Sequence, residues 1–275
     1  MEESLKKTNG MNRRDFGGLA IGSIAGIAFG QTLLAACGGE TSIAESTNPI
    51  VGPKAAPIVK HWAVEMHEIS SDLRNSAIPA KIWQERIEAL FDRVELEDLL
   101  KLIDFEALRK RVEIPDLGVG TQPVVFPKLE GLPEKTVFVK KIFGMKKGRA
   151  IVPHGHSNMA SAHLILKGDF HLRHFEKVAI EGKSLRIRPT IDRIAAAGDS
   201  SSISDERDNV HWFVANSDEA YTFDVIMLDL GGAKYDIHNI DIDGADRSGG
   251  DLLAPIIDVD TALKKYGKQH HGPLV

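Results

Sequence analysis

Two histidines separated by a single residue, His154 and His156, are the first side chains in this sequence whose type and spacing could do chemistry. On a β-strand, residues two apart project from the same face, so both imidazoles would lie side by side. His211 offers a third imidazole, because it lies where a polar loop runs into an apolar, aromatic segment typical of a strand. Most isolated His-x-His pairs bind nothing. Three imidazoles with open positions left over, however, suit a divalent metal that also binds substrate or oxygen.

Glycines recur at fixed distances around these histidines. Gly148 precedes the pair by six residues, Gly168 follows it by twelve, and Gly198 and Asn216 flank His211. This arrangement resembles the two motif halves of the cupin superfamily, small β-barrels with a metal in the mouth. The resemblance implies a mainly β fold, a single cupin-type β-barrel (double-stranded β-helix).

Ser161 stands where most metal-binding cupins carry a glutamate ligand. In this respect the chain resembles the thiol dioxygenase branch of cupins, the cysteamine dioxygenase and plant cysteine oxidase family. The shared segments are His154-Gly-His-Ser-Asn-Met159, Arg207-Asp-Asn-Val-His211 and the pair Tyr235-Asp236. The resemblance covers about residues 120–240. It implies one Fe(II) held by the three histidines, a small thiol-amine substrate and O2 as co-substrate.

Two positions differ from that family. Ser157-Asn158 replaces a Pro-Gly after the second histidine, and Gly155 replaces an Asp between the two histidines. Both changes fall at the predicted mouth of the barrel, so the identity of the substrate stays open. Manganese, zinc, copper and nickel are also compatible with three imidazoles.

The predicted strand 160–166 adds two candidate catalytic residues. If Ser161 points in the usual ligand direction, alternation turns His163 and Ile165 toward the barrel interior as well. The residues between them, Ala162, Leu164 and Leu166, then face outward. His163 is either a hydrogen-bond donor or substrate contact beside the metal, or a buried histidine that the backbone satisfies.

Three further positions have weaker signals. Tyr235 is a candidate catalytic residue by the family resemblance alone. Asp208 precedes His211 by three and could fix the tautomer of a ligating imidazole, although a solvated loop carboxylate is equally ordinary. Trp212 and Phe213 form either a water-excluding wall of the site or part of the core, while His171 and His174, three apart on a strand, point to opposite faces and are given no role.

The first 36 residues have the features of an export signal. Arg13 and Arg14 precede an apolar run that ends in Leu34-Ala-Ala-Cys37, a pattern that resembles a twin-arginine signal with the lipobox of bacterial lipoproteins. Cys37 would then carry lipid. We therefore expect export by the twin-arginine machinery and a membrane-anchored protein facing the periplasm or the cell exterior. A buried helix or an uncleaved membrane anchor is the alternative, the second because Gly22, Gly26 and Gly30 suit close packing in a bilayer.

Cysteine content and charge limit the chemistry further. Cys37 is the only cysteine, so the rest of the chain offers no disulfide, thiolate ligand or cysteine nucleophile. Any metal must then be held by histidine or carboxylate. The net charge of −5 and the absence of a basic patch argue against a nucleic-acid partner.

The rest of the chain divides by composition. Residues 37–57 are small, polar and proline-containing, which predicts a tether. Residues 58–112 show apolar positions every three or four residues, interrupted at Pro79, which predicts a helical module packed on the barrel. Here His61 and His67 lie on different faces and make poor joint ligands.

Short strands are expected over residues 136–143, 149–153, 160–166, 170–175, 184–188, 212–214 and 221–228, within a barrel at 120–240. The remaining 241–275 form a C-terminal extension whose aspartates only faintly resemble a calcium loop.

Three functions are compatible with these features. The first is a metal-dependent oxygenase similar to thiol dioxygenases. The second is a non-catalytic cupin that binds a metal or a small ligand at the cell envelope. The third is an interaction module in which the helices bind a partner, and it alone would survive loss of all three histidines. Fold does not choose among them.

Overall fold

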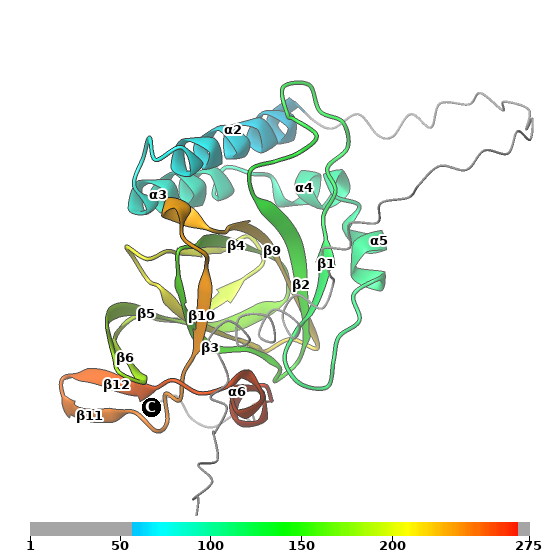
Figure 1. Cartoon of the computed structure of the whole chain (residues 1–275). Helices are drawn as coiled ribbons and strands as arrows, with labels where there is room; N and C mark the ends of the chain where they lie inside the picture. The colour runs from blue at the N-terminus through cyan, green and yellow to red at the C-terminus, as the bar shows by residue number, and fades with distance from the viewer. Residues whose placement is uncertain (1–56, 269–275) are drawn as a thin grey trace, which may run out of the picture.

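The computed structural model describes residues 57–268 (Figure 1). The predicted signal with Arg13 and Arg14, the lipidation site Cys37 and residues 38–56 of the tether lie outside the described residues. Within them the chain forms a mainly β protein, a barrel of two facing antiparallel sheets, with α-helices over the outer face of one sheet and a short helix on the other. No helix in this part of the chain is both long and apolar enough to cross a membrane.

Within residues 57–268, four α-helices precede the barrel and a fifth follows it. They are α2 (Pro57–Arg74), α3 (Ala80–Phe91), α4 (Leu96–Leu102), α5 (Phe105–Lys110) and α6 (Val259–Tyr266). Pro79 directly precedes α3, as the break in the sequence pattern predicts, because proline lacks the N–H that a continuing helix needs. The last part of the predicted helical module forms two short helices, α4 and α5, which are divided at Asp104, a residue with a positive φ of 49°.

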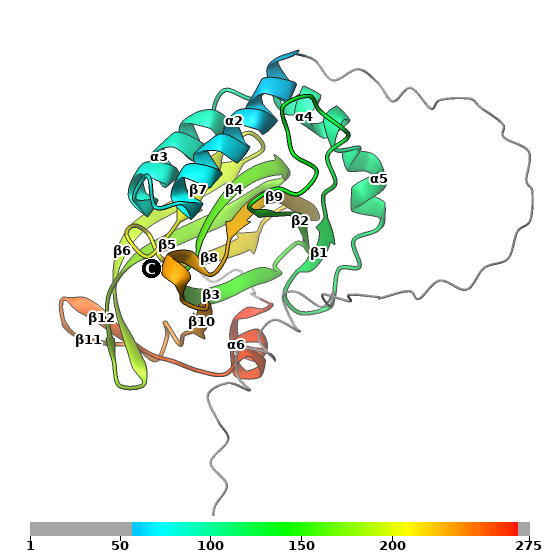
Figure 2. The same ribbon diagram turned by 45° about the horizontal axis from the view of Figure 1, so that its top comes forward.

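The first sheet has five strands in the order β1 (Gly120–Pro123), β2 (Val139–Lys146), β9 (Glu219–Met227), β4 (Ala160–Lys167) and β7 (Ser200–Ile203). Helices α2 and α3 lie over its outer face, above β4 and β7 (Figure 2). The second sheet has seven strands in the order β10 (Asp236–Asn239), β3 (Ala150–Ser157), β8 (Val210–Ala215), β5 (Asp169–Glu181), β6 (Ser184–Ala196), β12 (Asp251–Pro255) and β11 (Asp246–Gly249).

Several strand limits differ from those expected from the sequence. β3 continues past Pro153 to Ser157, and β5 and β6 extend far beyond the apolar stretches, forming a long hairpin with exposed polar residues. The short strands β1, β7, β10, β11 and β12 and the helix α6 were not expected. The strands among them carry little apolar alternation, and β1, β7, β10 and β12 are held by pairing with strands distant in the sequence.

Three clusters of buried apolar side chains hold the layers together. The largest joins the helices to the outer face of the five-stranded sheet and includes Trp62, Trp83 and Phe223. A second fills the barrel interior around Phe170 and Phe213. The third lies on the outer face of the seven-stranded sheet under α6, with Tyr266 at its centre.

The alternation along β4 agrees with the sequence-based expectation. Ile165 belongs to the interior cluster, whereas Ala162, Leu164 and Leu166 belong to the cluster beneath the helices. Because the helices cover the outer face, every β4 residue from Ala160 to Leu166 is buried. The barrel interior is therefore entered by the side chains of Ser161 and His163.

Candidate metal centre

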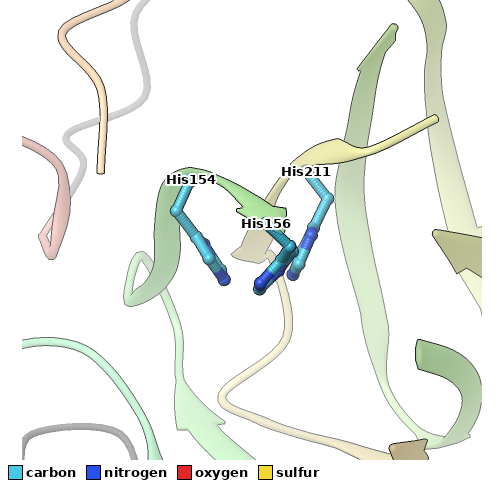
Figure 3. Close-up of side chains that lie close together, drawn as sticks. All are labelled: His154, His156 and His211. Atoms are coloured by element: carbon cyan, nitrogen blue, oxygen red, sulfur yellow. The ribbon is translucent and has the colours of Figure 1, made fainter. Parts of the chain in front are cut away.

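The three predicted ligands converge inside the barrel. His154 and His156 come from β3, and His211 comes from the neighbouring strand β8, where it lies directly opposite His154 in the register. Figure 3 shows the three side chains pointing toward one another. One nitrogen from each ring lies within 4.8 Å of the others, and all three residues are buried. A metal–nitrogen bond of about 2.1 Å lets one ion join nitrogens up to about 4.2 Å apart, so small side-chain rotations suffice.

A β-bulge gives the two β3 histidines this direction. Ile151 pairs with Phe213 and faces the interior, and Val152 faces outward into the cluster beneath α6. Unbroken alternation would then turn His154 outward. The register instead shifts between Ile151 and His154, so one extra residue is absorbed at Pro153 and both histidines face inward. Proline suits this position because its missing N–H removes a ladder donor.

The bulge also determines the hydrogen bonding of the first imidazole. Nδ1 of His154 lies 2.7 Å from the carbonyl oxygen of Val152. A neutral imidazole that donates there from Nδ1 keeps the lone pair of Nε2 free, which is the orientation seen in metal-binding histidines. The local backbone thus prepares His154 as a ligand.

The other two imidazoles have buried nitrogens without partners. Both ring nitrogens of His156 lack a hydrogen-bond partner among the described residues, and so does Nδ1 of His211. Burial lowers the pKa of His154 to about 4 and lowers the pKa values of His156 and His211 well below the ordinary value, with neighbouring imidazoles contributing to both. All three are therefore neutral near pH 7. Neutral, unsatisfied imidazoles fit a divalent metal, since the ion would occupy the lone pairs that are otherwise buried without partners.

Ser161 and His163 extend the site onto the five-stranded sheet. The Ser161 hydroxyl is buried without a partner in the described residues. Nδ1 of His163 lies 2.7 Å from Oδ2 of Asp224, and the hydroxyl of Thr222 donates to Oδ1 of the same carboxylate at 2.6 Å. The His163 ring lies 5.2 Å from that of His211, between centroids, and its Nε2 has no partner. The carboxylate that fixes a histidine in this barrel is thus Asp224, which no local sequence pattern indicates.

Asp208 and Tyr235 lie differently from the histidines. The Asp208 carboxylate is 3.6 Å from Nε of Arg207, and its backbone N–H donates to Glu176. Tyr235 is half-buried just before β10, where its backbone N–H donates to Asp229. No hydrogen bond within residues 57–268 joins either side chain to the three histidines.

His174 is a buried polar residue for which the sequence pattern predicts no role. It is fully buried on β5 opposite His211, with ring centroids 6.2 Å apart, and neither of its nitrogens has a partner in the described chain. Burial lowers its pKa to about 3. The inward alternation of Phe170 and Leu172 could have indicated its direction, since His174 continues the same series.

A cleft of about 500 Å³ opens where the α2–α3 turn meets the β3–β4 turn, and none of the three histidines lines it. Its wall includes Leu73, Ile78, Asn158, Met159, Asp205 and Glu206. Asn158 follows His156 by two residues, so the cleft adjoins the end of the strand that carries two of the histidines. The volume is in the range of small-molecule sites.

Comparisons with known proteins leave the function open. No protein-family model matches the sequence, and no curated protein is similar to it. Among solved structures, procruciferin from Brassica napus matches at 10% identity and a TM-score of 0.33, over 47% of this chain and 29% of that one. KdgF from Halomonas sp. matches at 15% identity and a TM-score of 0.29, over 40% of this chain and 77% of that one.

Oxalate oxidase in complex with glycolate matches at 16% identity and a TM-score of 0.30, over 41% of this chain and 52% of that one. The chain thus spans less than two thirds of procruciferin and of oxalate oxidase. At such identities and TM-scores, these likenesses assign neither substrate nor activity to it.

Proposed function

We propose that this protein is a metal-dependent oxygenase, with Fe(II) held by His154, His156 and His211, that oxidises a small thiol with O2. The observation that carries the proposal is the convergence of three buried, neutral imidazoles, two of which, His156 and His211, have nitrogens without a partner in the described chain. Ser161 stands where a carboxylate ligand would lower the charge of the ion. Three neutral ligands leave its charge undiminished, which favours a bound thiolate.

The reaction joins both atoms of O2 to the sulfur of a thiol and yields a sulfinic acid. Thiol and dioxygen together contain all the atoms of the product, and the sulfur supplies the four electrons that reduce O2, so no external reductant is needed. The ion, when bound, supplies Lewis acidity toward the thiol and redox chemistry toward oxygen.

The chain's own residues supply binding and shielding. Phe213 lies against His163 and His211, with ring centroids 5.1 and 5.6 Å away, and keeps water from that side of the centre. The contact of His163 Nδ1 with Asp224 leaves Nε2 as the free nitrogen on the side of the barrel interior, where it can hold a proton released by a thiol. The cleft beside Asn158 and Met159 offers an approach for a small molecule.

Metal analysis tests the proposal directly. The protein from residue 38 onward, folded in a bacterial cytoplasm, is compared with its His154→Ala and His211→Ala variants, with His171→Ala as a surface control. Near-stoichiometric iron that is lost in both site variants and kept in the control supports the three-histidine site. Oxygen uptake and a mass gain of two oxygen atoms on a small thiol would then support the activity. Metal without oxygen uptake across a set of thiols would favour a non-catalytic binding cupin, and metal indifferent to both substitutions would overturn the proposal.

As to cellular location, the export pattern around Arg13, Arg14 and Cys37 supports a protein that is anchored by lipid in the cell envelope. Replacing both arginines with lysine should retain the protein in the cytoplasm. A Cys37→Ser change should release exported protein from the membrane fraction. Membrane attachment that persists without Cys37 would support an uncleaved anchor instead.

A further inference from the structure

Asn209 connects the two strands that carry the predicted ligands. It lies two residues before His211 and is fully buried. Its Oδ1 accepts a hydrogen bond from the backbone N–H of His156 at 2.8 Å, and its Nδ2 donates to the carbonyl oxygen of His156 at 3.1 Å. One side chain therefore hydrogen-bonds both the backbone N–H and the backbone carbonyl of a predicted ligand. We call this pair of hydrogen bonds between Asn209 and His156 the clamp.

The same amide is fixed from the other side. Nδ2 also lies 3.0 Å from the carbonyl oxygen of Ser204 and 3.2 Å from Oδ1 of Asp205. Nζ of Lys177 donates to that carboxylate oxygen and to the carbonyl oxygen of His156. Both polar atoms of the Asn209 side chain thus have hydrogen-bond partners. Nitrogens of the nearby His156 and His211 rings have none in the described chain.

Gly155 makes room for this contact. A Cβ atom at this position would lie 3.0 Å from Oδ1 of Asn209 and 2.9 Å from Cγ2 of Val210. The paired residues of β3 and β8 end at His154 and His211, so the Asn209 amide takes the place of a further strand partner for His156. Gly155 therefore leaves the space that the Asn209 side chain needs to reach His156, and a larger residue here would disturb that contact.

Helix α3 holds the loop from which the clamp projects. The buried Gln84 accepts a hydrogen bond from the Ser204 hydroxyl at 2.6 Å and donates to the carbonyl oxygen of Arg207 at 3.3 Å. Oε1 of Glu88 lies 2.5 Å from Nη2 of Arg207. The helical module thus fixes both ends of the turn that leads to Asn209.

We infer that Asn209 is the positioning residue of the metal centre: it fixes His156 relative to His211 and transmits the support of helix α3 to the ligands. This inference rests on the metal-binding part of the proposed function. A residue that orients a ligand in this way sets metal affinity and coordination geometry without touching the ion.

Cobalt titration of the apoprotein provides the test, because the visible bands of Co(II) report coordination geometry as well as affinity. Asn209→Ala removes the amide. Asn209→Asp keeps its shape but turns an acceptor oxygen toward three other acceptors. Both should weaken Co(II) binding by about 10–100-fold and change the visible spectrum. Ser70→Ala, which loses a buried contact with Trp83 at 3.3 Å on the helical module, is the matched control and should leave both unchanged.

The outcomes separate the inference from the function on which it rests. Wild-type affinity and spectrum in both folded Asn209 variants, with binding lost in His154→Ala and His211→Ala, would overturn the positioning role alone. Cobalt binding that survives the two histidine substitutions would overturn the three-histidine site. If neither Asn209 variant folds, Asp205→Ala decides, because it removes the carboxylate that contacts Asn209, Lys177 and the Asn158 backbone N–H and leaves both Asn209–His156 hydrogen bonds in place. A loss of less than tenfold with a changed spectrum supports the inference, and no change overturns it.

Discussion

The two sheets of the barrel differ in what their faces contact. The five-stranded sheet is covered outside by α2 and α3 and packs inside against the interior cluster, so both of its faces are buried. The seven-stranded sheet carries all three predicted ligands on its inner face, and its long β5–β6 hairpin ends in exposed residues. The seven-stranded sheet is also covered in part on its outer face, by the cluster beneath α6, so the difference lies in the inward side chains. The five-stranded sheet contributes mostly apolar packing, whereas the seven-stranded sheet turns inward imidazoles with nitrogens that have no partner in the described chain and can bind a ligand.

The polar residues of the two sheets show the same difference. On the five-stranded sheet, His163 has Asp224 as a partner, and Asp224 has Thr222. On the seven-stranded sheet, His156 and His174 have no partner at either nitrogen within the described chain. Substitutions should therefore fall into two groups, those that weaken metal binding and those that lower the free energy of unfolding.

The largest expected effect is on metal binding by the seven-stranded sheet. Replacing His156 with alanine should weaken metal binding by more than about a hundredfold, since the free energy of a metal site is shared among few ligands. The free energy of unfolding of the apoprotein should stay within about 1 kcal/mol, because no hydrogen bond to the ring is lost. Metal titration and urea denaturation of the same preparation check both, and a strongly destabilised apoprotein would contradict the comparison.

Substitution on the helix-covered side should show the opposite pattern. Trp83 is completely buried between the helices, so Trp83→Ala should lower the free energy of unfolding by about 3–5 kcal/mol. The folded fraction should bind metal as the wild type does, because α3 contacts the turn before Asn209 through Gln84 and Glu88 rather than through Trp83. Denaturation curves give the first value and metal titration below the transition gives the second. Metal affinity that falls along with stability would show that the two sheets are not separable.

Acid should act through the seven-stranded sheet. His174 has a folded pKa of about 3, below the 6.5 of an unfolded histidine, so the unfolded state takes up the proton first. The stability tied to neutral His174 is therefore complete above pH 6.5 and is lost as the pH falls toward 3. Between pH 7 and pH 5 this costs the wild type about 2 kcal/mol. His174→Leu should lack that part of the acid sensitivity in denaturation curves at the two pH values, and equal slopes for both proteins would contradict the assignment.

The smallest effect should follow from Ser161 on the inner face of the five-stranded sheet. Its hydroxyl has no partner in the described residues, so Ser161→Ala should change stability by less than about 1 kcal/mol. Metal affinity should also be unchanged, since such ions are held by imidazole, thiolate and carboxylate groups rather than by a neutral hydroxyl. Metal titration is the check, and a loss of tenfold or more would make Ser161 part of the ligand set.

Local patterns in the sequence predict much of this architecture. The helical stripe with Trp83 and Ile87 lies in the core, and the alternation from Ser161 to Leu166 has the expected faces. The spacing of two predicts that His154 and His156 share a face, and the bulge at Pro153 decides that this face is the one on which they meet His211. That these residues bind iron, and that the substrate is a thiol, remain predictions.

Other features depend on contacts between distant parts of the chain. Asp224 reaches His163 across 61 positions, and Asn209 reaches His156 across 53. The direction of His174 depends on strand alternation, which short apolar segments establish poorly. Strands such as β7 and β10 have little pattern of their own and form because a neighbouring strand offers hydrogen-bonding groups.

Because of the bulge at Pro153, the number of residues along β3 decides whether His154 and His156 face the barrel interior. Because one extra residue separates Ile151 from His154, the number of residues between Gly148 and the histidine pair records the presence of the bulge. A one-residue insertion or deletion at this place would ordinarily pass as a harmless length change. In this strand it is a change of phase that can move both imidazoles from the inside of the barrel to its surface, so related chains are best compared here by strand register rather than by residue identity.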